Sequence, residues 1–279
     1  MAADSLIVTG IPRSGTTLIC SLISQMRNAC CLSEPMEVDG YIRLAASADE
    51  FLLKVSEFFE QQRRQIIESG AALNRADRSG DLSSNYFRRN GSGQIEDESL
   101  IASVQVDVEN DDFTLAVKHN AHFLAVLPRL IALGRYRVFS VIRHPVPTIL
   151  SWQSLRLPVS SGRLPAAENL WPAVREIAQS PRELMVKQVL LYETLMTRIL
   201  ECRQGVHIIS YEKLVADPAQ LCVLMNQSYR KPVTLNSQNE NKHYDWSKAE
   251  ALKEALTAYA PNTMSVYPRL DDTGARAQL

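Results

Sequence analysis

Long apolar runs are absent from this sequence of 279 residues, and so is any strong excess of one charge. A membrane-spanning helix needs about 20 consecutive apolar residues, so we expect no membrane span. The first residues contain no basic segment followed by an apolar core, so we expect no signal peptide. The formal net charge of −1 gives no basic surface, so we expect no nucleic-acid partner.

Cysteine is also sparse, and its spacing fits neither a metal site nor a paired framework. The five cysteines are an odd number, at positions 20, 30, 31, 202 and 222. This usage predicts buried thiols in a reducing compartment, and hence a cytoplasmic protein. His119 and His122 are three residues apart, but no third ligand has suitable spacing, so we expect no metal.

The most informative stretch is a turn between an apolar strand and an amphipathic helix. Residues 6–8 predict a buried strand, and residues 18–26 carry apolar side chains at helical spacing. Such a turn directs amide N–H groups and the positive end of a helix at an anion. We therefore predict a phosphate site formed by Pro12, Arg13, Ser14, Gly15, Thr16 and Thr17. The alternative is an ordinary turn before a core helix.

This turn differs from the loop that binds nucleoside triphosphates. That loop follows the pattern G-x-x-x-x-G-K-[ST], in which the lysine reaches the terminal phosphates. Gly10 and Gly15 have the right spacing, but Thr16 stands in place of the lysine. The cation is Arg13, two residues before the second glycine, so the turn lacks the lysine of metal-assisted ATP chemistry.

Charged side chains follow two further predicted strands. Glu34 comes after the strand at 30–32, and Lys118 comes after the strand at 113–117. Open α/β sheets bind ligands at the carboxyl ends of their strands, so these side chains are candidate site residues. The alternative for Glu34 is an acid that stabilises the start of a helix. His119 is a candidate general base because its ordinary pKa suits that role.

A second phosphate site is predicted where the apolar strand at 136–142 ends in Arg143. A guanidinium there can bind a phosphate through two hydrogen bonds. A helix follows, and Ser151 lies eight residues after Arg143, about two helical turns along. The strand does not end in the acid that would hold magnesium, which argues against an NTPase.

These two motifs together resemble those of sulfotransferases that use 3′-phosphoadenosine 5′-phosphosulfate (PAPS). Residues 12–17, Pro-Arg-Ser-Gly-Thr-Thr, resemble the family's 5′-phosphosulfate loop, and residues 141–145 with Ser151 resemble its 3′-phosphate motif. The segment that begins at Tyr211 is similar to a family segment whose tyrosine lines the adenine pocket. The family often closes a later region over the nucleotide with basic residues, which here indicates Lys242.

The resemblance also indicates a base and a fold. In tyrosylprotein sulfotransferases a glutamate follows the loop arginine by 21 residues, as Glu34 follows Arg13, and Lys118 matches the family lysine. Cytosolic relatives carry a histidine where Asn120 stands, which leaves His119 or His122 as the alternative base. The implied fold is a three-layer α/β domain over residues 1–279, with a mostly parallel central sheet, helices on both faces and an insertion at about 70–112.

We therefore predict in-line transfer of a sulfuryl group from PAPS to a hydroxyl of a small-molecule, sugar or lipid acceptor. Arg13 and Lys118 would offset the negative charge that develops on the sulfuryl and bridging oxygens, and Glu34 would take the proton of the acceptor hydroxyl. Met36 stands where a basic residue would hold an acidic tyrosine peptide, which argues against a protein substrate. The alternatives are a P-loop kinase or NTPase acting on a small metabolite, and a non-catalytic nucleotide-binding protein. No oligomeric state is predicted.

The remaining segments give simpler expectations. The apolar stripe over 48–69 predicts a helix ended by Gly70, and residues 71–98 predict a loop with a turn at Gly91-Ser92-Gly93. Tyr86 and Phe87, beside Arg88 and Arg89, are candidates for a substrate lid. Further helices are expected at about 167–178 and 181–203, and a frayed tail after Asp271.

Overall fold

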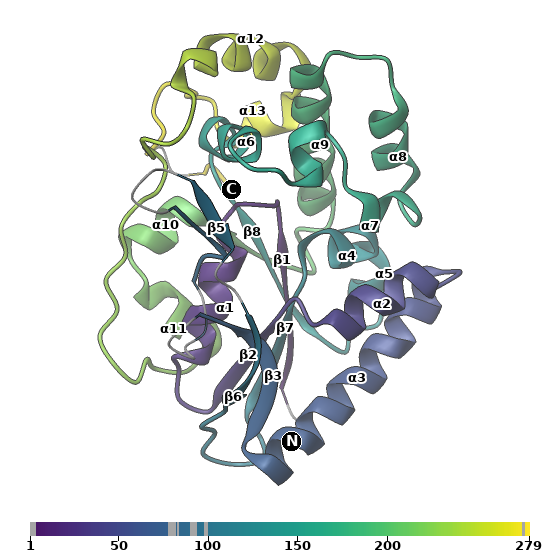
Figure 1. The fold of residues 1–279 in the computed structure, drawn as a ribbon, viewed down its shortest axis with the longest axis vertical. Helices are drawn as coiled ribbons and strands as arrows, with labels where there is room; N and C mark the ends of the chain where they lie inside the picture. Colours follow the sequence, from purple (N-terminus) through teal and green to yellow (C-terminus); the bar gives the residue numbers. More distant parts are fainter. Residues whose placement is uncertain (1–3, 78–81, 83, 90–93, 98–99, 275–276) are drawn as a thin grey trace.

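Five parallel strands form the central sheet, in the order β2-β7-β1-β8-β9 (Figure 1). This computed structural model describes residues 4–77, 82, 84–89, 94–97, 100–274 and 277–279. The strands are β1 (Ser5–Gly10), β2 (Ala29–Ser33), β7 (Thr114–Lys118), β8 (Arg137–Ile142) and β9 (His207–Ser210). Apolar, nearly continuous sequences suit strands that are buried on both faces.

The register of the central strand brings distant parts of the chain together. Leu6 of β1 pairs with Ala116 of β7 on one side and with Arg137 of β8 on the other. Because all five strands run in the same direction, their carboxyl ends meet at one edge of the sheet. The segments that follow β1, β2, β7 and β8 therefore lie near one another.

Helices cover both faces of the sheet, which confirms the predicted three-layer α/β architecture. Successive residues of β1 alternate between the faces: Leu6 and Val8 pack in one apolar cluster, and Ile7 packs in the other. The first cluster is covered by α1 (Thr16–Ser24), α10 (Tyr211–Ala216) and α11 (Ala219–Met225) (Figure 1).

The second face carries the larger apolar cluster and more helices. They are α2 (Met36–Leu44), α3 (Ala48–Ser69), α4 (Asn120–Ala125), α5 (Leu127–Ala132), α6 (Pro145–Gln153), α7 (Pro165–Glu168), α8 (Pro172–Gln179), α9 (Leu184–Glu201), α12 (Ala249–Tyr259) and α13 (Pro261–Val266). Two short 3₁₀ helices, η1 (Pro158–Ser161) and η2 (Trp246–Lys248), lie in the connections.

Helix α3 confirms the prediction for residues 48–69. The Ser47 side chain accepts a hydrogen bond from the Glu50 N–H and so caps the helix. Gly70 ends it in the left-handed region, with φ of 64°. By contrast, the helix expected over 167–178 is divided, because Pro172 begins a new helix, α8, after Trp171.

The insertion contains strands where the sequence predicted a loop. The strands β3 (Ala71–Ala76) and β6 (Leu100–Gln105) form one antiparallel pair, and β4 (Phe87–Arg89) and β5 (Ile95–Asp97) form another. The expected turn at 91–93 lies outside the described residues. Asn74 attaches β3 to β2, since its amide accepts from the Ser33 N–H at 2.8 Å and donates to the Cys31 carbonyl at 2.8 Å.

The described tail is not frayed, so that prediction is wrong. The Gln278 N–H donates to the Val266 carbonyl at 2.9 Å, and Ala277 packs in the larger apolar cluster. None of the helices in the described residues has both the length and the apolar character needed to cross a bilayer.

Candidate functional site

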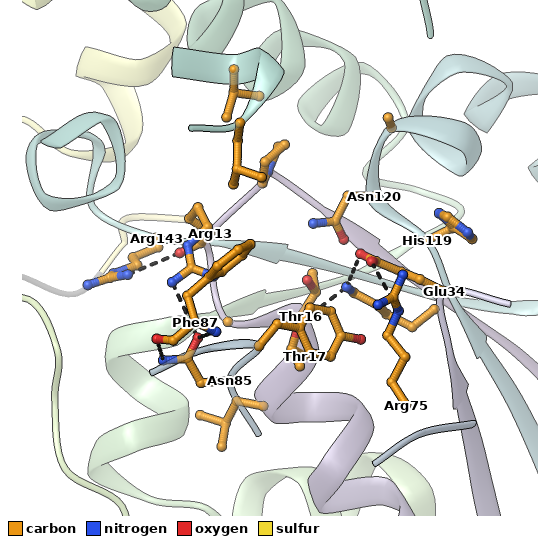
Figure 2. Close-up of a pocket in the computed structure, with 18 of the residues that line it drawn as sticks. Arg13, Thr16, Thr17, Glu34, Arg75, Asn85, Phe87, His119, Asn120 and Arg143 are labelled. Carbon is orange, nitrogen blue, oxygen red and sulfur yellow. Dashed lines mark hydrogen bonds and ion pairs between the residues drawn. The ribbon is translucent and has the colours of Figure 1, made fainter. Parts of the chain in front are cut away.

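A cavity of about 950 Å³ opens at the carboxyl edge of the sheet (Figure 2). Its walls come from the turn after β1, the residues that follow β2, β7 and β8, the insertion, and residues 234–244. This is the position where open α/β sheets hold their ligands. Figure 2 shows Arg13 and Arg143 on one side, Glu34 and Arg75 on the other, and Thr16 between them.

The turn after β1 is fixed tightly to β8 and α6. Gly10 has φ of 146°, and a Cβ there would lie 2.3 Å from the Val141 carbonyl oxygen, so only glycine fits. The Ser14 hydroxyl donates to the same carbonyl at 2.9 Å. The Trp152 indole donates to the Pro12 carbonyl at 2.7 Å. Ser14 and Pro12 thus hold the shape of the turn.

The turn delivers the start of α1 to the cavity. The first N–H groups of a helix have no partner within the helix, and they form a ready site for an anion. In α1 the Ile19 N–H donates to the Gly15 carbonyl at 3.0 Å, which leaves the N–H groups before it at the open end. Gly15, Thr16 and Thr17 all line the cavity.

Lys118 and Glu34 form a buried ion pair beside this helix start. Their Nζ and Oε1 atoms lie 2.5 Å apart, and the Lys118 side chain is only 2% exposed. Lys118 also donates to the Thr17 hydroxyl at 3.3 Å. Burial raises the pKa of Glu34, but Lys118, His119 and Arg75 together outweigh burial and lower it to about 2. Glu34 is therefore ionised at neutral pH.

Two residues of the insertion complete this side, and only one of them was singled out from the sequence. The Arg75 Nε lies 3.9 Å from Glu34 Oε2. The Tyr86 ring lies under both the Arg75 guanidinium, at 5.1 Å, and the Lys118 ammonium, at 5.2 Å. The Tyr86 hydroxyl forms a hydrogen bond with the Ser33 hydroxyl. Tyr86 was expected from its position in the insertion, whereas Arg75 was not.

Arg143 forms the second cationic part of the cavity, and it is only 4% exposed. Its guanidinium donates to the Asn239 amide oxygen at 2.7 Å, the Arg13 carbonyl at 3.0 Å and the Gln238 carbonyl at 2.8 Å. The Tyr211 ring lies 4.6 Å beneath the guanidinium, and it also packs behind Gly15. Tyr211 therefore links the two anion sites that the sequence predicts.

The side chain of Arg13 lies on the Arg143 side of the cavity. Its Nε donates to the Ser151 hydroxyl at 3.2 Å, and its guanidinium lies 5.2 Å from the Phe87 ring (Figure 2). Arg13 was predicted to act on the transferred group together with Lys118, and that role stays a prediction. Its side chain lies against Ser151, and φ of 70° places its backbone in the left-handed region.

Residues 236–244 supply side chains that sequence reasoning missed. Lys242, the residue predicted there, is exposed and is not part of the cavity wall. Tyr244 lines the wall instead, and although burial raises its pKa, Arg143 and hydrogen bonding with Ser151 lower it overall. Asn239 is held by the Glu212 carboxylate at 3.0 Å. This polar segment shows no periodicity, so no pattern singled out these residues.

The start of α4 places two stacked histidines in the same cavity. The rings of His119 and His122 lie 3.8 Å apart, and His122 Nε2 lies 3.0 Å from an Asp39 carboxylate oxygen. Burial lowers the pKa of both histidines, so both are neutral at pH 7. Among the residues that the structure describes, no cluster of three metal-binding side chains is present.

Comparisons with known proteins give little beyond this geometry. No family model matches the sequence, and a search of curated proteins finds no match. Among solved structures, the chain is similar to a sulfotransferase from Alicyclobacillus acidocaldarius, with 11% sequence identity and a TM-score of 0.47. That similarity covers 96% of this chain and 97% of the other. The function of this chain has to be inferred from its own cavity.

Proposed function

We propose that this protein transfers a sulfuryl group from PAPS to a hydroxyl group of an acceptor molecule. One observation carries the proposal: Lys118 ends β7 and Arg143 follows β8, the two strands that flank β1, so a cation stands on each side of the helix start. PAPS has negative groups at both ends, a 5′-phosphosulfate and a 3′-phosphate. A single monophosphate would need only one of these cations.

The charges of the cavity fit such a ligand. Among the residues that the structure describes, its walls contain five cationic side chains, from Arg13, Arg43, Arg75, Lys118 and Arg143. The same described residues supply only two carboxylates, from Glu34 and Asp39. A cavity with a surplus of positive charge concentrates anions and compensates their charge. The buried guanidinium of Arg143 also has the planar donor geometry that matches a phosphate.

Each part of the cavity has a role in this proposal. The first turn of α1, with Thr16 and Thr17, holds the 5′ end through N–H and hydroxyl groups. Arg143 holds the 3′ end. Ser151 is buried behind the cavity wall, and its hydroxyl positions the Arg13 side chain at the same end. Fixing both ends sets the position of the reacting group relative to the acceptor.

When bound, PAPS supplies a sulfuryl group whose bond to the phosphate oxygen breaks as a bond to the acceptor oxygen forms. Lys118 offsets the negative charge that develops on the oxygens around the reacting sulfur. The acceptor hydroxyl must lose its proton, and the ionised carboxylate of Glu34 stands beside Lys118 to receive it. These cations are side chains, so the proposed reaction needs no metal.

The test is a comparison of ligands by thermal unfolding. The protein is titrated with 3′-phosphoadenosine 5′-phosphate, with AMP and with ATP–magnesium. A ligand at about 100 times its Kd stabilises the folded state by about 2.7 kcal/mol. We expect this effect from the bisphosphate, a smaller one from AMP, and loss of the bisphosphate effect in Arg143→Ala. Arg129→Ala is the control, since Arg129 is exposed and pairs with Asp49.

The alternatives give different results. Stabilisation by ATP–magnesium alone would overturn the proposal and favour a kinase. Binding of the bisphosphate without sulfuryl transfer to any hydroxyl compound would indicate a non-catalytic nucleotide-binding protein.

A further inference from the structure

The start of α4 leaves three buried polar atoms without a hydrogen-bond partner in the described part of the chain. They are His119 Nε2, Asn120 Oδ1 and His122 Nδ1. His119 is 7% exposed and His122 is 5% exposed, and all three residues line the cavity. Buried polar groups normally have partners, and leaving one unpaired is costly. Three such atoms together indicate that a ligand supplies the hydrogen-bond partners that the protein does not.

All three atoms are hydrogen-bond acceptors. The Asp39 carboxylate can only accept, so His122 Nε2 carries the proton and His122 Nδ1 has a free lone pair. Burial lowers the pKa of His119 more than its hydrogen bond to the Pro35 backbone raises it, so the ring is neutral. With its one proton on the nitrogen that donates to that backbone, Nε2 is an acceptor without a partner. These tautomers follow from the hydrogen-bond network. Asn120 Oδ1 is a carbonyl oxygen. The missing partners are therefore donors.

The surrounding charges select the kind of donor. The two carboxylates nearby already face cations: Asp39 lies 2.6 Å from Arg43, and Glu34 lies 2.5 Å from Lys118. Burial lowers the pKa of both histidines, so they add no charge at pH 7. Among the described residues of the cavity wall, no carboxylate is left without a cation for an ammonium ligand to pair with, and an anionic ligand would bring acceptors. Neutral hydroxyl groups meet the requirement.

The position of this cluster ties it to the acceptor. His119 follows Lys118 directly in the chain, and Figure 2 shows His119 and Asn120 around Glu34, across the cavity from Arg143. Apolar residues of the segment 157–166 also line the cavity. A ring with hydroxyls on its edge and C–H groups on its face fits between such a polar edge and an apolar wall.

We propose that the acceptor is a neutral polyhydroxylated molecule, such as a sugar or a cyclitol. Hydroxyls of this molecule next to the reacting one donate hydrogen bonds to side chains of His119, Asn120 and His122. Asp39 is a positioning residue that fixes the tautomer of His122. This inference rests on the proposed sulfuryl transfer and adds the class of its acceptor.

The first test compares matched hydroxyl compounds with PAPS as donor. One pair is myo-inositol and cyclohexanol, and the other is octyl β-glucopyranoside and 1-octanol. Release of 3′-phosphoadenosine 5′-phosphate gives kcat/KM for each compound. We expect the polyhydroxylated member of at least one pair to exceed its partner about tenfold or more, because a polar site rejects an analogue that leaves its groups unpaired.

Two outcomes would overturn the inference. One is equal or faster turnover of the monohydroxy compounds. The other is no turnover of either polyhydroxylated compound by a protein that binds the bisphosphate and transfers sulfuryl to other hydroxyls. Failure to bind the bisphosphate would instead overturn the proposed function itself, so the two failures are distinguishable.

The second test uses Asn120→Ala, with Asn262→Ala as the matched control. Asn262 has a partner, since its amide donates to the Thr197 hydroxyl at 2.9 Å. Removing an unpaired acceptor from the first turn of a helix should leave the melting temperature unchanged or raise it. At the same time, kcat/KM for the polyhydroxylated compound should fall about tenfold. A lower melting temperature with unchanged kcat/KM would show a structural role and contradict the inference.

Discussion

At the scale of single residues, the Lys118–Glu34 pair decides the electrostatics of the cavity. Lys118 is almost fully buried and has the Glu34 carboxylate at 2.5 Å. A buried charge whose partner is removed is strongly destabilising, because the remaining charge has lost its compensation. The pair therefore couples the stability of the folded protein to the pH of the solution.

We expect Glu34→Gln to lower the free energy of unfolding by about 1–3 kcal/mol at pH 7. The pKa of Glu34 is lowered from its ordinary value of 4.5 to about 2, so its stabilisation is complete above about pH 5 and is lost as the pH falls toward 2. Urea unfolding of the wild type and the variant between pH 7 and pH 3 measures this. The difference between them should shrink with falling pH.

The control for this experiment is Glu57→Gln. Glu57 pairs with Lys54 at 2.9 Å on the exposed side of α3, where ion pairs contribute less than about 1 kcal/mol. A Glu34→Gln effect that stays constant from pH 7 to pH 3 would show that the ion pair does not carry the stabilisation.

Single residues at strand ends could be located from the sequence, and others could not. Lys118 and Arg143 lie where short apolar strands end, and the carboxyl end of a parallel strand places the residues there at one edge of the sheet. The direction of Arg13 was not predictable, because it depends on Ser151, which is 138 residues away. Asn239 and Tyr244 lie in a polar segment, where only tertiary contacts with Arg143 distinguish them from their neighbours.

At the scale of secondary structure elements, the distance between β1 and β8 depends on one glycine. The backbone of Gly10 approaches the Val141 carbonyl so closely that a Cβ would lie 2.3 Å from its oxygen. Real Cβ atoms do not approach carbonyl oxygens this closely, so any other residue would separate the strands at the point where the turn after β1 begins.

We expect Gly10→Ala to destabilise the protein by about 3 kcal/mol or more, through both overlap and the positive φ. The matched control is Gly40→Ala in α2, where a Cβ meets nothing within 4 Å. That change should stabilise by about 0.5–1 kcal/mol, because alanine is the better helix former. Chemical denaturation measures both variants, and equal effects would contradict the packing of β1 on β8.

Elements with a strong local pattern were predicted, and those formed by pairing were not. The helix α3 carries its apolar stripe, its Ser47 cap and its Gly70 end in its own sequence. The strand β3 has no comparable pattern, and it is positioned by pairing with β6 and by the two hydrogen bonds of Asn74 to β2. Such contacts cannot be deduced from the sequence of residues 71–98 alone.

At the scale of the whole molecule, the tail reaches back to the cavity. The Thr273 carbonyl accepts a hydrogen bond from the Asn239 amide at 2.5 Å, and Asn239 in turn accepts from Arg143. Ala277 packs in the larger apolar cluster. The chain end thus supports the anion site from outside.

We expect a chain ended after Asp272 to bind 3′-phosphoadenosine 5′-phosphate several-fold more weakly and to melt at a lower temperature. The loss of the Thr273 carbonyl frees one side of Asn239, and the loss of Ala277 exposes apolar surface. Isothermal titration and thermal unfolding measure the two effects. Removal of Leu279 alone is the control, because its side chain is exposed. Unchanged affinity in the shortened chain would show that the tail does not support ligand binding.

The strand order has a kinetic consequence. The cavity walls come from residues near 13, 34, 118, 143 and 240, and they meet only when β7 and β8 have both paired with β1. If the protein binds the bisphosphate as proposed, a folding transition state that lacks one of these pairings gains nothing from the ligand. The ligand then retards unfolding in proportion to its occupancy and leaves the rate of folding unchanged.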